Sequence, residues 1–430
     1  MLQMQNCIRY CLFVGALASA VLLHIGPAQA ATESVVHSFG GPPDDGWDPR
    51  ASLIDVGGTL YGTTAGGGAK GGGIVFKVNP DIGAETVLYS FCSQTNCTDG
   101  QWPMASLIDV GGTLYGTTES GGANCANYCG GTVFSLNPKT GAETVVYSFC
   151  SQAKCTDGHN PYPSASLTDV GGTLYGTTWS GGANCGKNGG CGTVFAVNPE
   201  TGAETVVYSF CSQTNCADGS FPSGRLIDVG GTLYGTTEYG GVNCQVGCGT
   251  VFKLDPNTGA ETVVHTFGRY GRDGVGPTTG VIEVSGILYG TTQLGGAHCH
   301  KKNEEGCGTV FRVNLQTGAE SVVHSFCSIG KCTDGGGPYA GLIDVGGTLY
   351  GTTAVGGAKG DCRHGCGTVF SVNPKTGAET VVYSFICTQG NCTDAENPSA
   401  SLIDVGGTLY GTTAEGGTKG YGTVFKVTLP

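Results

Sequence analysis

The thirteen-residue sequence SLIDVGGTLYGTT occupies residues 52–64 and is repeated without change at residues 106–118 and 401–413. Its LYGTT core occurs seven times, at spacings of 54 to 61 residues. Repetition at a nearly fixed period indicates a solenoid, a propeller or an array, in which one unit cannot bury its apolar face alone. The seven copies carry Tyr61, Tyr115, Tyr175, Tyr234, Tyr289, Tyr350 and Tyr410.

Each unit reads as four short strands. In the second unit, residues 106–110 and 113–118 flank a Gly-Gly pair, which is typical of a two-residue hairpin turn. A glycine-rich loop leads to a third run, 132–136, and an Asn-Pro-Lys-Thr-Gly turn leads to a fourth, 144–149. No run has the 3.6-residue period of a helix, so the pattern predicts four antiparallel strands per unit.

Seven four-stranded units predict an all-β, seven-bladed β-propeller, because radial stacking buries both faces of every sheet. A linear solenoid would leave two ends that need capping units. The last unit stops after its third strand, whereas residues 34–39 form a fourth strand with no unit before it. We therefore expect the N-terminal strand to complete the last blade, with blades at about 51–91, 105–149, 165–210, 224–267, 280–326, 340–385 and 400–428 plus 34–39.

Residues 1–30 have the composition of a secretory signal peptide, with Arg9 before an apolar run and Pro-Ala-Gln-Ala at the end. Cleavage near Ala30 predicts a secreted or periplasmic propeller over residues 31–430, without membrane insertion. Beyond Arg9, 19 basic residues face 33 acidic ones. This balance argues against nucleic acid and anionic membranes as partners, because both are polyanions.

The recurring LYGTT, Gly-Gly loop and GTVF elements resemble the GloVer (Gloeobacter/Verrucomicrobium-type) tandem repeat of exported bacterial choice-of-anchor proteins. LYGTT is present in all seven units and GTVF in six, with Gly73-Ile74-Val75-Phe76 as the variant. The resemblance spans essentially the whole chain after residue 30. It implies an extracytoplasmic repeat protein and supplies no catalytic residues.

Twenty cysteines beyond residue 30 occur as pairs within single loops. Of the fourteen loops that join the fourth strand to the next unit or the second strand to the third, ten contain two cysteines and four contain none. This pattern predicts one disulfide per loop; zinc is the rival explanation. The predicted pairs are Cys92/Cys97, Cys125/Cys129, Cys150/Cys155, Cys185/Cys191, Cys211/Cys216, Cys244/Cys248, Cys299/Cys307, Cys327/Cys332, Cys362/Cys366 and Cys387/Cys392.

In antiparallel blades both loop types emerge on one face, and the tight turns on the other. Aromatic residues occur in the long loops, where they suit ligand contact as well as capping of the core. The candidate ligand-binding residues are Trp47, Trp102, Trp179, Tyr162, Phe221 and Tyr339.

Two carboxylates also recur in every unit. One precedes the turn of the loop that follows the fourth strand, and a turn-stabilising role is favoured over a calcium site. Its members are Asp45, Asp99, Asp157, Asp218, Asp273, Asp334 and Asp394. The other ends the first strand, where it either accepts hydrogen bonds from the Gly-Gly turn or rings the channel as a weak candidate for a structural cation such as calcium. Its members are Asp55, Asp109, Asp169, Asp228, Glu283, Asp344 and Asp404.

Histidines 37, 265 and 324 replace a tyrosine in the fourth strand, and His298-Cys299-His300 is read as part of a solvated insertion. No catalytic motif or organic cofactor is predicted, because every carboxylate singled out is repeated. The sequence favours a monomeric binding or scaffold module for a glycan or an envelope protein. The alternative is a hydrolase or lyase at the channel mouth, for which residues 267–279 and 298–307 depart most from the consensus.

Overall fold

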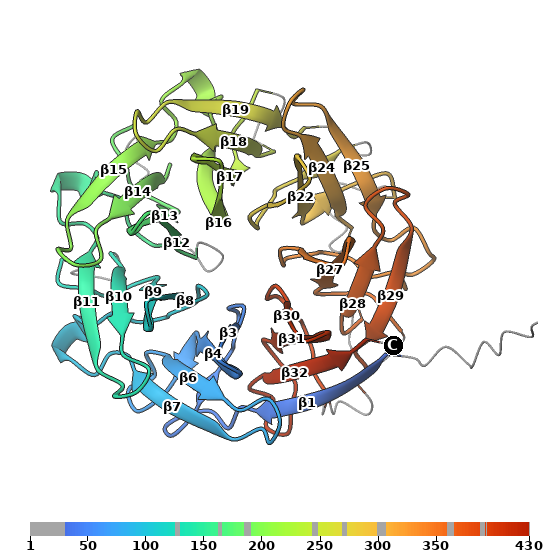
Figure 1. Ribbon diagram of the computed structural model, residues 1–430, viewed down its shortest axis with the longest axis horizontal. Coiled ribbons are helices and arrows are strands. Elements are labelled where there is room, and N and C mark those ends of the chain that lie inside the picture. Colours follow the sequence, from blue (N-terminus) through green and yellow to red (C-terminus); the bar gives the residue numbers. More distant parts are fainter. Residues whose placement is uncertain are drawn as a thin grey trace, which may run out of the picture.

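The computed structural model describes residues 31–124, 130–161, 166–184, 191–242, 248–268, 273–298, 307–358, 365–387, 392 and 394–429. Over these residues the strands form seven four-stranded antiparallel sheets, arranged radially around a central axis (Figure 1). Apart from three single-turn 3₁₀ segments, η1 (Thr95–Cys97), η2 (Ala153–Cys155) and η3 (Thr214–Cys216), these residues contain no helix. The chain is therefore an all-β, seven-bladed propeller.

Each blade runs from a short inner strand to an outer strand. The first four blades are β3 (Ile54–Val56), β4 (Thr59–Thr64), β6 (Ile74–Val78) and β7 (Glu85–Ser90); β8 (Ile108–Val110), β9 (Thr113–Thr118), β10 (Thr132–Leu136) and β11 (Glu143–Ser148); β12 (Thr168–Val170), β13 (Thr173–Thr178), β14 (Thr193–Val197) and β15 (Glu204–Ser209); and β16 (Ser220–Val229), β17 (Thr232–Tyr239), β18 (Thr250–Leu254) and β19 (Glu261–Thr266).

The last three blades follow the same order, and the seventh takes its outer strand from the beginning of the chain. They are β21 (Ile282–Val284), β22 (Ile287–Thr292), β24 (Thr309–Asn314) and β25 (Glu320–Ser325); β26 (Ile343–Val345), β27 (Thr348–Thr353), β28 (Thr368–Val372) and β29 (Glu379–Ser384); and β30 (Ile403–Val405), β31 (Thr408–Thr413), β32 (Thr423–Thr428) and β1 (Thr32–Ser38).

The predicted ring closure is confirmed. Strand β1 pairs antiparallel with β32, and Val35 lies opposite Phe425. The two segments lie side by side in Figure 1, where the blue and red ends of the chain share one blade. No outer edge of β32 is left unpaired, which removes a site at which another chain could add a strand.

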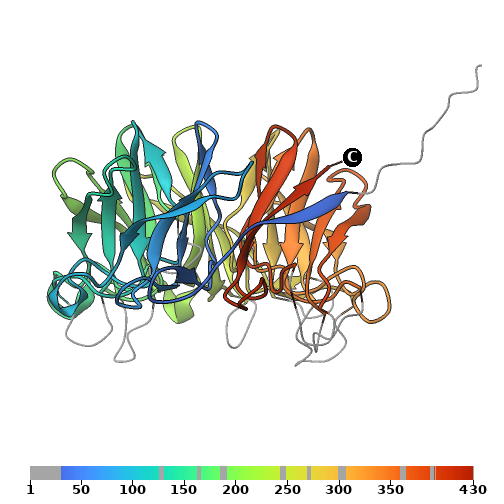
Figure 2. The same cartoon turned by 90° about the horizontal axis from the view of Figure 1, so that it is seen from below.

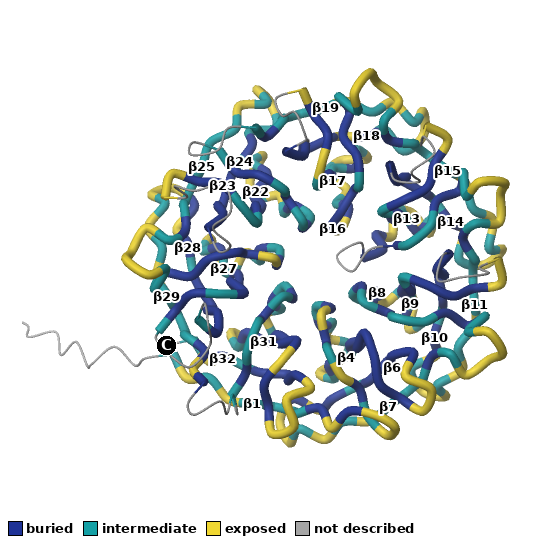
Figure 3. Tube along the Cα trace, turned by 180° about the vertical axis from the view of Figure 1, so that it is seen from behind, coloured by how far each residue is buried: buried dark blue, intermediate teal, exposed yellow. Residues whose placement is uncertain are grey.

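Phenylalanines join every blade to the next. A phenylalanine that follows the outer strand of one blade packs edge-to-face on the phenylalanine of the third strand in the next blade, with ring centroids 4.9 to 5.1 Å apart. The contact repeats at all seven interfaces, including Phe39 against Phe76 and Phe385 against Phe425. All of these phenylalanines are fully buried. In Figure 3 exposed turns mark the outer rim of the ring.

Two local features differ from the sequence-based prediction. The inner strand of the second blade was expected over residues 106–110, but only Ile108–Val110 is paired. The preceding backbone instead bonds to neighbouring blades: Ala105 accepts a hydrogen bond from Thr63, and Ser106 donates one to Ser166. The second feature is a β-bulge in each outer strand, such as the one at Val36, which shifts the register by one residue.

The long loops share one face, as predicted. In the side view of Figure 2 they lie below the blades, and the tight turns lie above. Short pairings join each outer-strand loop to the following blade's second loop, as in β2 (Gly46–Trp47) with β5 (Gly66–Gly67) and β20 (Gly274–Val275) with β23 (Leu294–Gly295). Bridges at Gln101, His159, Gly336 and Glu396 repeat this contact elsewhere.

Candidate functional site

The central axis of the propeller contains a cavity of about 440 Å³. It is lined by the segments that lead into the inner strands. Each blade contributes the residue directly before the buried leucine or valine of this segment. Six of these seven positions are small. In chain order the residues are Ser52, Ser106, Ser166, Arg225, Gly280, Gly341 and Ser401.

Arg225 breaks the sevenfold symmetry of this lining. It lies on β16, which spans ten residues, whereas the inner strands of the other blades span three. Two glycines allow the local packing: a Cβ on Gly224 would stand 2.0 Å from the amide nitrogen of Gly280, and one on Gly280 would stand 2.3 Å from the carbonyl oxygen of Arg225. The backbones of the fourth and fifth blades therefore approach closely at the point where Arg225 enters the cavity.

The Arg225 guanidinium has a neutral hydrogen-bond partner. Its Nε donates to Oγ1 of Thr168 at 3.4 Å, and among the described residues no carboxylate lies within ion-pair distance. Although solvent in the cavity reaches the side chain, the surrounding protein lowers the pKa of Arg225 by desolvation. An arginine stays protonated despite such a shift. The cavity therefore contains an exposed cation with no carboxylate within ion-pair distance among the described residues, although Asp55 belongs to the same lining.

Tyr339 also lines the cavity, and 38% of this residue is exposed. Its hydroxyl accepts a hydrogen bond from the side-chain amide of Gln293. Of the predicted ligand-binding aromatics, Tyr339 is the one that lines the same cavity as Arg225.

Three other aromatic rings form a cluster on the loop face. Trp179 packs on Phe221 with ring centroids 4.4 Å apart, and Phe221 contacts Tyr239 edge-to-face at 5.5 Å. Phe221 lies four residues before Arg225 on the same strand. Tyr239, which is 38% exposed, was not singled out from the sequence, although it follows LYGTT by one residue in this unit alone.

Among the described residues, Trp47 and Trp102 are not part of this cluster. Trp47 is 39% exposed and covers Gly66, where a Cβ would stand 2.2 Å from the indole. Trp102 is half-buried, and its backbone bonds to Gly72 and Glu119. Tyr162 lies outside the described residues. Ligand binding by these aromatics stays a prediction.

The loop aspartates accept hydrogen bonds within their own loops, which agrees with the turn-stabilising role that the sequence favoured. Asp99 is fully buried, and its carboxylate accepts hydrogen bonds from Tyr89, from Ser93 and from the backbone of Gln94. Each of the other six accepts at least one backbone hydrogen bond within its loop. Asp45, for example, accepts the amide protons of Gly40 and Gly46.

The carboxylates at the ends of the inner strands are exposed. Six of them accept the second amide proton of their Gly-Gly or Ser-Gly turn, as Asp55 does from Gly58 at 2.9 Å. No three of these side chains bring ligand atoms within 4.8 Å of one another. The turn interpretation is thus confirmed for six residues, and a cation in the channel stays a prediction.

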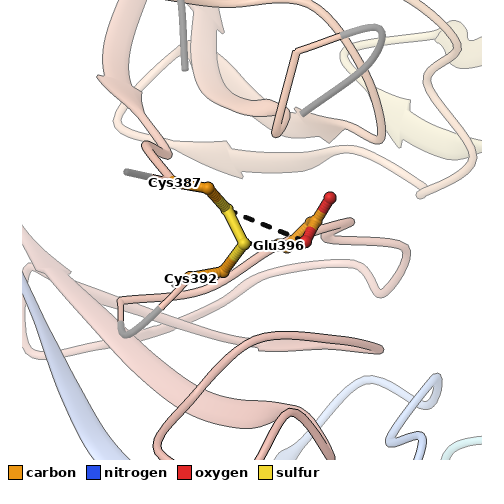
Figure 4. A group of neighbouring side chains, drawn as sticks. All are labelled: Cys387, Cys392 and Glu396. Carbon is orange, nitrogen blue, oxygen red and sulfur yellow. Dashed lines mark hydrogen bonds between the residues drawn. A yellow bond between two sulfur atoms is a disulfide. The ribbon is translucent and has the colours of Figure 1, made fainter. Parts of the chain in front are cut away.

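Five predicted disulfides are present, all in loops that leave an outer strand. In the second loop type, Cys248, Cys307 and Cys366 are disulfide-bonded, but each predicted partner lies outside the described residues, as do Cys125 and Cys129. Figure 4 shows Glu396 beside the Cys387–Cys392 disulfide, with Oε2 2.9 Å from Cys392 Sγ. Because both thiols are consumed by the bond, this group is a cross-linked loop rather than a zinc site.

The disulfide predicted for Cys185/Cys191 stays a prediction, because Cys185 lies outside the described residues. Cys191 is 5% exposed and packs in an apolar cluster with Phe210 and Leu226.

A further set of glutamates was missed in the sequence. Each begins the ETVV-like outer strand and lies near the loop aspartate of the preceding blade. Burial, assisted in most cases by that aspartate, raises the pKa of each to about 7. The set consists of Glu33, Glu85, Glu143, Glu204, Glu261, Glu320 and Glu379.

Solved structures with a similar fold include two at a TM-score above 0.5. One is an oligogalacturonate lyase in complex with manganese, at 12% identity and a TM-score of 0.52, with 94% of this chain and 98% of that chain covered. The other is the GH74 xyloglucanase from Xanthomonas campestris, at 12% identity and a TM-score of 0.51, with 89% of this chain but 52% of that chain covered. At this identity the likeness shows the fold alone.

No curated protein matches the sequence, and no helix among the described residues is long and apolar enough to span a bilayer. The model of the Gloeobacter/Verrucomicrobia repeat matches residues 15–187, 152–363 and 299–430. These overlapping matches extend over nearly the entire sequence and agree with the LYGTT and GTVF periodicity. The chain therefore belongs to the Gloeobacter/Verrucomicrobia repeat family.

Proposed function

We propose that this chain is an exported binding propeller that takes an acidic oligosaccharide into its central cavity. Arg225 would hold a carboxylate of a uronic acid. The observation that carries the proposal is the placement of this cation, without a carboxylate within ion-pair distance among the described residues, at a lining position that is serine or glycine in the other six blades.

The chemistry of the site favours a planar anion. A guanidinium presents paired donors that match a carboxylate, and such charge-assisted hydrogen bonds are stronger where water is partly excluded. The chain as a whole has a formal net charge of −13, so long-range attraction of polyanions is weak. Recognition would therefore depend on local contacts with Arg225, Tyr339 and the serine hydroxyls of the lining.

The aromatic cluster extends the proposed site onto the loop face. Trp179, Phe221 and Tyr239 supply rigid apolar surface at the start of the strand that carries Arg225. The apolar faces of sugar rings stack on such surfaces. A chain of several sugars could contact the cluster while one uronate reaches the cavity.

Binding without turnover is favoured over hydrolysis. A glycosidase generally needs two carboxylates on either side of the bond that it cleaves. The described residues of the lining include a single carboxylate, Asp55, which accepts a hydrogen bond from Gly58. The alternative in the enzyme class is a lyase, because Arg225 could neutralise a uronate carboxylate and Tyr339 could exchange a proton in the same cavity.

The names of the two structural neighbours support a carbohydrate ligand only as a class. Export is supported by the signal-peptide pattern of residues 1–30 and by the five disulfides, which are typical of an oxidising compartment. We expect the exported chain to act as a monomer.

The test is calorimetric titration of the purified chain with matched neutral and uronic acid oligosaccharides. We expect binding of the acidic series, and a loss of about 2 kcal/mol, or roughly thirtyfold in Kd, in Arg225→Ser. Serine is the matched replacement because four other blades have it at this position. Equal affinity for both series, or an unchanged Kd in the variant, would contradict the proposal. Release of unsaturated products that ceases in Arg225→Ser and in Tyr339→Phe would select the lyase alternative.

A further inference from the structure

The outer rim of the propeller repeats a three-residue contact at each blade interface. A ring near the end of the outer strand lies beside the aspartate of the following loop and the glutamate that begins the next blade's outer strand. The ring is a tyrosine at four interfaces and a histidine at three, namely His37, His265 and His324. At the tyrosine interfaces the phenol donates to the aspartate, as Tyr89 does to Asp99 at 2.9 Å.

Two of the histidine interfaces bring three possible metal ligands together. They consist of His37, Asp45 and Glu85, and of His265, Asp273 and Glu320, and in each group the ligand atoms all lie within 4.8 Å of one another. Within each group, histidine Nε2 is 3.5 Å from the aspartate Oδ2. A tetrahedral ion at roughly 2.1 Å from its ligands places them roughly 3.4 Å apart, so this pair is already at the required spacing.

The same two interfaces lack the loop disulfide. Residues 39–51 and 267–280 contain no cysteine, whereas each of the other five outer-strand loops contains a bonded pair. The third histidine provides the internal comparison. His324 stands 3.7 Å from Asp334, in a loop closed by the Cys327–Cys332 disulfide, and this interface forms no such three-ligand group.

The histidine and glutamate ligand atoms also lack hydrogen-bond partners, whereas the aspartates bond to their own loops. Nε2 of His37 and of His265, and Oε1 of Glu85 and of Glu320, are inaccessible to solvent and make no hydrogen bond. A buried polar atom without a partner destabilises the folded state, and an ion bound there would remove this cost. Glutamate Oε1 is buried without a hydrogen bond at all seven interfaces. Only the histidine interfaces also have an imidazole nitrogen that can coordinate an ion.

We propose that each of these two trios binds one divalent transition-metal ion, with Zn²⁺ as the test ion. The ion ties the outer strand, its loop and the next blade together where the loop has no disulfide. One imidazole and two carboxylates suit Zn²⁺ better than Ca²⁺, which prefers oxygen ligands alone. The first trio joins the closing strand β1 to the first blade, so this ion would also fasten the ring closure.

The experiment uses the tag-free purified chain, stripped with chelator and dialysed against Zn²⁺, with metal counted by mass spectrometry. We expect two equivalents in the parent chain, one in His37→Tyr, one in His265→Tyr and none in the double variant. Tyrosine is compatible with the fold because four interfaces already have it. Asp45→Asn, which keeps the histidine, should also lose one equivalent, so the result does not depend on a single substitution.

His324→Tyr is the matched control and should retain both equivalents. Zn²⁺ should raise the melting temperature of the parent chain and leave that of the double variant unchanged, whereas Ca²⁺ should affect neither. Fewer than two equivalents in the parent chain would overturn the proposal, and so would a stoichiometry that the double variant retains. A loss in His324→Tyr would overturn the link to the missing disulfides.

Discussion

The glycine of each LYGTT motif lies against two side chains that belong to other parts of its repeat. At Gly116, a Cβ would stand 2.6 Å from the ring of Phe134 and 2.9 Å from Leu107. The same contact recurs at Gly62, Gly176 and Gly235, against the phenylalanine of the third strand. LYGTT and GTVF are therefore coupled, because the buried phenylalanine fits only where the facing strand has no side chain.

We expect Gly116→Ala to lower the free energy of unfolding by about 1–3 kcal/mol, the usual result of adding a methyl group to a packed core. Urea unfolding followed by circular dichroism measures this change. Gly330→Ala is the control, since its Cβ would meet no atom within 4 Å and its backbone does not need a positive φ. Equal effects at the two glycines would contradict the steric explanation.

Much of the residue-level detail could be predicted from the sequence, but Arg225 was missed. The repeated sequence motifs predicted the strands, the turn roles of both aspartate sets and the five disulfides of the outer-strand loops. Arg225 interrupts an otherwise small position, and this signal is visible once the seven units are aligned. The repeated residues indicate the architecture of the propeller, whereas an asymmetric site is marked by a departure from the repeat. Phe267–Thr279, which was expected to hold such a site, contributes Thr279 to the cavity.

At the scale of elements, the bulge in the outer strand decides which side chains meet between blades. In the first blade the register shifts around Leu88, and a Cβ on Gly141 of the next blade would stand 2.6 Å from the Leu88 carbonyl oxygen. The run ETVLYS alternates in a way that fits either register, so the sequence alone could not reveal the bulge. The rim glutamates were missed because each lies near the loop aspartate of the preceding blade, and a pattern within one repeat does not reveal a contact between blades.

These glutamates predict a stability that falls as the pH rises. Burial raises the pKa of Glu143, Glu204 and Glu261 from 4.5 to about 7 in the folded chain. Between these values the folded state retains protons that the unfolded chain has lost, so the free energy of unfolding decreases with increasing pH. We expect a higher urea midpoint at pH 5 than at pH 8.

Single substitutions separate this effect from the general repulsion of an acidic chain. Glu204→Gln should reduce the difference between the two pH values, because glutamine does not titrate. Glu200→Gln, four residues earlier in an exposed turn, removes the same charge and should leave the difference nearly unchanged. A midpoint that rises between pH 5 and pH 8, or equal behaviour of the two variants, would contradict the prediction.

For the whole molecule, the sequence predicted that the N-terminal strand closes the ring. This prediction rested on counting strands, and the pairing of Val35 with Phe425 bears it out. What counting could not supply is the energetic role of the closure. The closing strand contributes hydrogen bonds to β32, and it positions Phe39, which packs against Phe76 of the first blade.

A chain that begins at Gly40 should therefore fail to fold stably. Truncating one buried phenylalanine costs about 3–5 kcal/mol. Removing β1 also removes its hydrogen bonds to β32 and leaves β32 with an unpaired edge. Compared with a chain that begins at Ala31, we expect loss of the cooperative thermal transition and association through β32. A synthetic peptide of residues 31–40, added during refolding, should restore the transition, because it can pair with β32 as a separate strand. Unaltered melting of the shortened chain would mean that six complete blades and a three-stranded seventh hold the ring without its closing strand.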